Sequence, residues 1–310
     1  MHRSKKFLLI VGLILLFVTI AAAVTYHVIR RPAKAIYLLP DGNVMAYVNF
    51  TPLHFLNLDT KSFASDPQYQ DFTAQTGFHF EHDLDNVAIS GSSAGELTGE
   101  ASAIFTGTFD QERLTSYVQK QPGVETESYS GKKIFFMHEG NQNQTVRVCI
   151  LDGKTVIVTA GTSPESMHGI IDKSSGSGQA PSLLQDHYSD VPFGSVAWAI
   201  VRVPDSSTPA TPGGFNFDFL KNSVTVMSVR YSGSVRVRAE FISENQADAT
   251  HVFQAVNGFV AFARATQGGR NADKDVAALI DNVQLQQNGN RVVLNVVVPQ
   301  EVVQKISASR

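Results

Sequence analysis

The pentapeptide Gly91-Ser92-Ser93-Ala94-Gly95 matches the G-x-S-x-G pattern, in which the central serine is the nucleophile of many hydrolases. In that chemistry the serine lies between a strand and a helix, and the helix N-terminus helps to stabilise the oxyanion. Here the residues on both sides, 87–90 and 101–109, favour strands. We therefore interpret the glycines as a hairpin loop and keep Ser93 as the alternative, a catalytic nucleophile. The residues that would complete a triad with it are Asp186, His187 and His251.

The segment from His79 to Asp85 places five side chains that could bind a metal ion within seven residues. Zinc needs three or four ligands at one point, and neither an H-E-x-x-H helix nor a second Cys/His pair accompanies this segment. Val87 and Ala88 stand where a calcium loop needs an acid and a glycine. A polar loop is the favoured interpretation. The alternative metal ligands are His79, Glu81 and His82.

Residues 235–241 alternate apolar and polar side chains, which predicts a strand with one face on a core and the other in water. Arg236 and Arg238, with Arg230 nearby, would share the solvated face and could bind an anionic partner. Glu240 lies on the same face and reduces the charge, so we favour an ordinary solvated face.

The composition is that of a globular protein. With 43% hydrophobic, 17% charged and 9% aromatic residues in 310, the chain is not a disordered, collagen-like or disulfide-scaffold protein. A net charge of -3 gives no broad basic field, so we expect no nucleic-acid partner. The single Cys149 lies in an apolar run, which favours burial over reactivity. Phosphate-loop, dinucleotide and C-x-x-C motifs are absent from the sequence, so we predict no cofactor.

The N-terminus holds an apolar segment long enough to cross a membrane. The eighteen residues 7–24 include no charged residue. A helix over them would be roughly 27 Å long, close to the thickness of about 30 Å of a bilayer's hydrocarbon core. We predict a transmembrane signal-anchor helix over 7–29. Its first apolar residues are Phe7, Leu8, Leu9, Ile10, Val11, Leu13, Ile14, Leu15, Leu16, Phe17 and Val18. A cleaved signal peptide, cut near Ala21-Ala22-Ala23, is the alternative, but the run exceeds the usual length of about 7 to 15 residues.

Basic residues flank this segment on both sides, so the positive-inside bias nearly cancels. Residues 1–6 form only a short basic tail, which favours a cytoplasmic N-terminus and an exported C-terminal body. We therefore expect a single-pass protein of the cell membrane whose body is periplasmic or extracellular. The expected partners are the lipid bilayer, through the helix, and an envelope protein.

The rest of the chain predicts an α+β body of largely antiparallel sheets with packed helices. Asp152-Gly153 and Asn288-Gly289 each separate two strand-like runs and suit tight hairpins. Residues 243–265 have helical spacing of apolar side chains, with Ser243 and Gln246 as a capping box. Asp110 would cap a shorter helix.

The two halves of the body carry the same order of elements, which indicates a duplicated unit. Each half opens with a strand, continues with a strand pair and a helix, and ends with a hairpin. We assign 35–172 to the first α+β unit, 173–190 to a linker, and 191–310 to the second unit. The first unit has an extra hairpin over 125–137.

The opening Leu39-Pro40, followed after five residues by Ala46-Tyr47-Val48, resembles a loose group of uncharacterised bacterial extracytoplasmic proteins. Thr76-Gly77-Phe78-His79 and Asp83-Leu84-Asp85 resemble a second phrase of that group. The resemblance covers about the first two thirds of the body. It implies a single membrane anchor and repeated α+β units, and it implies no activity.

Two hypotheses on function follow. The first is a membrane-anchored, non-enzymatic binding or envelope-assembly module. The second is a membrane-tethered serine hydrolase that uses Ser93. The element after Gly95 discriminates between them, because a helix favours catalysis and a strand favours a loop.

Overall fold

The computed structural model describes residues 32–54, 66–92, 100–139, 144–176, 178–203, 218–267, 274–298 and 300. Ala35–Arg310 forms one compact unit. The expected tail 1–6 and signal-anchor helix 7–29 lie outside the described residues. Within the described part of the chain, no helix is long and apolar enough to cross a membrane.

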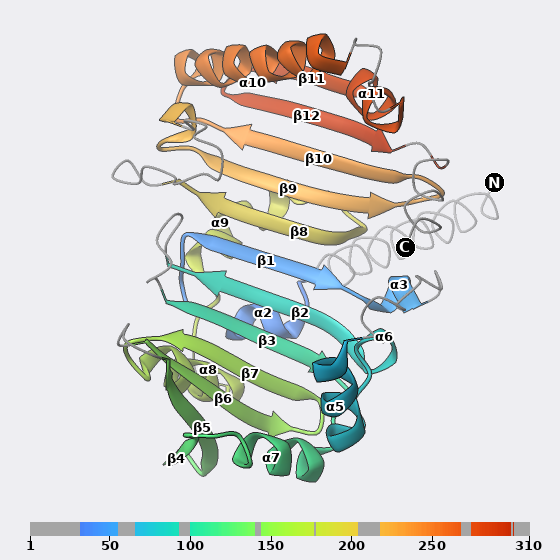
Figure 1. Ribbon diagram of the computed structural model, residues 1–310. Helices are drawn as coiled ribbons and strands as arrows, with labels where there is room; N and C mark the ends of the chain where they lie inside the picture. Colours follow the sequence, from blue (N-terminus) through green and yellow to red (C-terminus); the bar gives the residue numbers. More distant parts are fainter. Residues whose placement is uncertain are drawn as a thin grey trace, which may run out of the picture. The chain divides into compact units, whose positions relative to one another are not determined.

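The body is an α+β structure built on one antiparallel sheet (Figure 1). Its strands are β1 (Val44–Asn49), β2 (Leu84–Gly91), β3 (Ala101–Gly107), β4 (Glu125–Tyr129), β5 (Lys132–Glu139), β6 (Gln144–Asp152), β7 (Thr155–Gly161), β8 (Ser195–Arg202), β9 (Val224–Tyr231), β10 (Val235–Ile242), β11 (Val283–Asn288) and β12 (Arg291–Val298). The α-helices are α2 (Lys34–Leu38), α3 (Thr51–His54), α5 (Pro67–Thr76), α6 (Phe80–Asp83), α7 (Gln111–Gln119), α8 (Glu165–Ser174), α9 (Ser182–His187), α10 (Gln246–Gln267) and α11 (Lys274–Asp281). Two short 3-10 helices are η1 (Tyr188–Asp190) and η2 (Asp218–Leu220).

The strand order is β11-β12-β10-β9-β8-β1-β2-β3-β7-β6-β5-β4. Its centre is the antiparallel pair of β1 and β8, the two strands expected to open the halves of the body. Outward from that pair, each half continues with two strands that follow one another in the chain and then with a hairpin whose second strand is the inner one. The first half adds the pair β4 and β5 at its edge, which confirms the expected extra hairpin.

Local sequence explains most element boundaries. The hairpins β6–β7 and β11–β12 turn at the expected Asp-Gly and Asn-Gly pairs, and Gly289 has a φ of 59° that glycine adopts easily. Asp110 caps α7 through a 3.1 Å bond from the Arg113 amide, as expected. The cap of α10 differs from the expectation, because Asn245 rather than Ser243 accepts the Asp248 amide, at 3.0 Å.

The segment expected to be a linker, 173–190, contains the end of α8, then α9 and η1. Leu183 and Leu184 of α9 are buried, so this segment is a packed part of the body. Its glycines and most of its serines lie before Pro181, while the leucines that follow supply an apolar surface. The main-chain amide of Ser182 also donates to Asp41, at 2.6 Å.

The rear face of the sheet in Figure 1 carries the main core, beneath α2, α8 and α9. Side chains of one strand alternate between the two faces, so the strand register assigns each residue to a face. Across the middle of the sheet the rear-face residues are almost completely buried: Met45, Ala88, Ile104, Ile157 and Ile200 have an exposed fraction of 0%. From the helices, Ile36, Ile170 and Leu183 are equally buried.

The front face is covered by helices only at its two ends. At one end Leu114 of α7 and Phe72 of α5 pack with Phe135 and Val156. At the other end Val252 and Val256 of α10 pack with Val292. Between these two clusters none of the described helices lies in front of strands β8, β1 and β2 (Figure 1).

Candidate functional site

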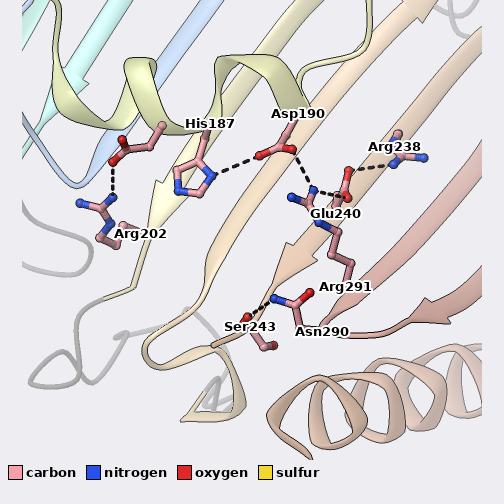
Figure 2. A network of polar contacts seen from close by, with 9 residues as sticks. His187, Asp190, Arg202, Arg238, Glu240, Ser243, Asn290 and Arg291 are labelled. Atoms are coloured by element: carbon pink, nitrogen blue, oxygen red, sulfur yellow. Dashed lines mark hydrogen bonds and ion pairs between the residues drawn. The ribbon is translucent and has the colours of Figure 1, made fainter. Parts of the chain in front are cut away.

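The structure offers two sites worth weighing, a polar network on the rear face and an apolar surface on the front face. The polar network joins η1 to strands β10 and β12 (Figure 2). Glu240 is buried, and its carboxylate accepts from Arg238 at 2.7 Å and from Arg291 at 2.9 Å. Asp190 accepts from Arg291 at 2.8 Å and lies 3.2 Å from Nδ1 of His187. The hydrogen bonds that Arg291 donates to Glu240 and Asp190 raise the pKa of its guanidinium.

The network contains an acid and a base but carries no catalytic arrangement. In His187 and Asp190 a carboxylate orients an imidazole, as in hydrolases, but the other carboxylate oxygen of Asp190 is held by Arg291. Nearby, the side-chain amide of Asn290 donates a hydrogen bond to the main-chain carbonyl of Ser243. Arg202 forms an ion pair with Asp186 at 3.5 Å. These contacts tie η1 to the second half of the sheet, so we read the network as structural.

The strand prediction over 235–241 is confirmed, and Arg230, Arg236, Arg238 and Glu240 share one face. The interpretation of that face as simply solvated is wrong for Glu240, which is only 5% exposed. A buried carboxylate needs cationic partners to offset its lost hydration, and Arg238 and Arg291 supply them.

The G-x-S-x-G segment begins as the connection between two neighbouring antiparallel strands. Gly91 is the last residue of β2 and pairs with Ala101 of β3. The Ser92 hydroxyl accepts from the Glu100 amide at 3.0 Å, which closes the start of the hairpin. Ser93 lies outside the described residues, so its catalytic role stays a prediction. The next described element is a strand, and this is the feature that favours a loop.

The triad partners considered with Ser93 lie on two helices, α9 and α10. Asp186 and His187 are on α9 and hold Arg202 and Asp190, whereas His251 is exposed on α10. Asp186 and His187 thus already take part in structural contacts.

The candidate metal ligands surround the short helix α6. Glu81 accepts a hydrogen bond from the Tyr69 hydroxyl, and this bond helps to lower the pKa of Glu81 against the opposing effect of burial. The rings of His79 and His82 have centroids 6.5 Å apart, and the His79 amide donates to Asp83 at 2.8 Å. Among the described residues, no group of three or more His, Cys, Asp or Glu side chains is placed to hold a metal ion. The role of these three residues as ligands stays a prediction.

The apolar surface lies on the front face, and sequence reasoning did not single it out. We call it the central strip. It consists of Val44, Ala46, Val48, Val87, Ile89, Ala103, Ala197, Ala199, Val201, Met227 and Val229. None of these side chains is fully buried, and Ile89 and Met227 are 40% and 42% exposed. Their neighbours on the rear face, such as Ile104, are 0% exposed.

The register gives the central strip a shape. Met227, Ala199, Ala46 and Ile89 lie side by side on β9, β8, β1 and β2. Two alanines thus stand between two large exposed side chains. At about 4.8 Å per strand, the strands that carry Met227 and Ile89 are about 14 Å apart. In this row the alanine side chains are smaller than Met227 and Ile89, and we call this low part of the central strip, over β8 and β1, the trough.

Comparison with known proteins bears on the fold alone. No protein-family model matches the chain, and no curated protein matches it in sequence. A solved structure described as crystal form IV of TP0453 is similar, with a TM-score of 0.50 and 10% identity, over 89% of this chain and 97% of that chain. Crystal form I of the same protein gives a TM-score of 0.47 and 9% identity, over 90% of this chain and 98% of that chain. The similarity supports an α+β fold of this kind and assigns no activity.

Proposed function

We propose that this protein is a membrane-anchored, non-enzymatic binding module of the cell envelope, and that the central strip holds an amphipathic helix of a protein partner. The anchor is the helix over 7–29, and the body, two copies of one α+β unit over 35–172 and 191–310, lies outside the cytoplasmic membrane. The observation that carries the proposal is the contrast, among the described residues, between the largely buried rear face of these strands and their apolar front face, where Ile89 and Met227 are 40% and 42% exposed.

The chemistry of the central strip selects the partner. The strip has no charged side chain and none that hydrogen-bonds to a described residue. On the same face of β8 and β9, the described polar side chains are Thr225, which is buried, and Tyr231 at the end of β9. A ligand must therefore contribute apolar surface and must satisfy its own polar groups. A helix does so, because its backbone donors and acceptors are paired internally.

The dimensions of the trough also fit a helix. A helix with its side chains is about 10 to 12 Å wide, and the flanking residues Met227 and Ile89 stand on strands about 14 Å apart. Ala46 and Ala199 on the floor allow close approach. The same face already packs against α7 at one end and α10 at the other, so a third helix would continue that layer.

The first test is the location of the body. External protease should digest residues 35–310 in intact spheroplasts, since the body is expected to be exported. Protection of the body until the membrane is dissolved would contradict the proposal.

The second test maps the contact. A photo-crosslinking amino acid at Met227 should yield one discrete protein adduct, whose crosslinked positions recur at helical spacing of three and four residues. Ala199→Glu should abolish the adduct, because it places a charge on the trough floor. Gln284→Glu, an exposed position of β11 on the rear face, should leave it unchanged. Adducts only to lipid, or an adduct insensitive to Ala199→Glu, would contradict the helix.

A further inference from the structure

The rear face holds two arginines that nothing in the described part of the chain neutralises. Arg230 of β9 and Arg236 of β10 are direct cross-strand partners. Directly opposed side chains on one sheet face have Cβ atoms about 5 Å apart, and like charges in such a pair destabilise the sheet. Neither guanidinium has an ion pair or a hydrogen bond to any described residue, and Arg236 is exposed.

The nearby carboxylates are already occupied. Glu240 is the acidic residue of the same face on these strands, four residues from Arg236, which is about 13 Å along a strand. It is shared between Arg238 and Arg291, and Asp190 is shared between Arg291 and His187. Among the described residues, Arg230 and Arg236 therefore form a local positive charge, in a protein whose net charge is -3.

Two exposed apolar side chains lie near this pair at the same end of the sheet. Val297, opposite Arg236 on the same face, is 41% exposed. Phe193 lies two residues before Ser195, the partner of Arg230 on β8, and is 54% exposed. Arginine together with exposed aromatic residues is typical of protein surfaces that rest at the headgroup level of a membrane.

We propose that Arg230 and Arg236 together bind the phosphate group of an anionic lipid, with Phe193 and Val297 in contact with the lipid surface. A phosphate between the two guanidinium groups would remove their repulsion and accept hydrogen bonds from both. Charge complementarity favours an anionic lipid over a neutral one, and the exposed apolar side chains favour a lipid over free phosphate. This inference is independent of the central strip and its partner.

The full chain allows a fluorescent label to be attached at one chosen position near the two arginines. Cys149 is 0% exposed, so a cysteine introduced at the exposed Ser232, in the β9–β10 turn, can be labelled selectively with an environment-sensitive fluorophore. The labelled protein is placed in dodecyl maltoside micelles, to which phosphatidylglycerol, phosphatidylcholine or inorganic phosphate is added. The anchor need not insert for this measurement, so its outcome is separate from the tests of the proposed function.

We expect phosphatidylglycerol to shift the fluorescence, with phosphatidylcholine and inorganic phosphate much weaker. Arg230→Gln combined with Arg236→Gln should weaken the response about thirtyfold, since each arginine near an anionic lipid surface contributes about 1 kcal/mol. The matched control is Arg113→Gln combined with Arg264→Gln. It removes the same charge from α7 and α10 and should change the fluorescence response to phosphatidylglycerol little. An equal response to phosphatidylcholine, a response to inorganic phosphate alone, no response, or equal loss in both double variants would overturn the proposal.

Discussion

At the scale of single residues, a buried charged group in this protein depends on specific partners. Glu240 shows this best, because one carboxylate satisfies Arg238 and Arg291 and is itself shielded from water. Arg238 and Glu240 are close in sequence on β10, whereas Arg291 and Asp190 are 101 residues apart. Removing a shared partner leaves more than one charge without compensation.

Replacing Glu240 by alanine should therefore destabilise the fold by about 2 kcal/mol, because Arg238 and Arg291 lose their shared carboxylate. Urea unfolding measures the change. Glu244→Ala removes an exposed carboxylate that makes no contact with the described residues, and it should cost less than about 0.5 kcal/mol. Equal unfolding midpoints for the two variants would contradict a stabilising role of the network.

Cys149 predicts a pH dependence of stability. Burial raises the pKa of its thiol to about 11. The folded state then holds the proton more tightly than the unfolded chain, whose thiol has a pKa of about 8.5. The contribution of the protonated thiol to stability is complete below about pH 8.5 and is lost as the pH rises from there to about 11, and the total loss is about 3 kcal/mol.

The measurement is the free energy of unfolding between pH 8 and 11, compared with that of Cys149→Ala. The variant lacks the thiol, so its stability should fall less steeply with pH, while the contributions of tyrosines cancel between the two proteins. Parallel curves of unfolding free energy against pH for the two proteins would show that the Cys149 thiol does not contribute to the pH dependence.

At the scale of elements, the central strands are apolar on both faces, yet only one face is covered by described helices. Ile104 of β3 and Ile89 of β2 are the same residue type on neighbouring strands of one sheet. Ile104 faces the rear core and is 0% exposed, while Ile89 faces the front and is 40% exposed. Their contributions to folding must differ accordingly.

Ile104→Ala should cost about 3 kcal/mol, because it leaves a cavity in a closely packed core. Ile89→Ala should cost less than about 1 kcal/mol, because its side chain is largely hydrated in the free protein. Urea titration followed by circular dichroism compares the two. A large loss of stability in Ile89→Ala would mean that another part of this chain covers the central strip.

On the scale of the whole molecule, one continuous sheet joins the two halves through β1 and β8. The single tryptophan reports on this junction. Trp198 of β8 has its ring centroid 6.0 Å from Tyr47 of β1 and 5.7 Å from Tyr188 of η1. Its fluorescence is therefore sensitive to separation of the halves.

We expect Trp198 fluorescence and far-ultraviolet circular dichroism to give the same unfolding midpoint, since a shared sheet couples the halves. Ile157→Ala in the first half and Val292→Ala in the second, both at positions with 0% exposure, should each lower both midpoints together. If the Trp198 midpoint responded to only one of them, the halves would unfold independently.

The sequence by itself determined the α+β class, the antiparallel pairing, the Asp-Gly and Asn-Gly hairpins and the Asp110 cap, because these depend on neighbours within a few residues. It also indicated the repeated order of elements, which the strand order on either side of β1 and β8 resembles. Tertiary structure decided that α9 is buried, that Glu240 is buried beside Arg291, and that no described helix covers the front face of β8, β1 and β2. Each of these depends on segments far apart in the chain, and an apolar strand has the same sequence whether one of its faces or both are covered.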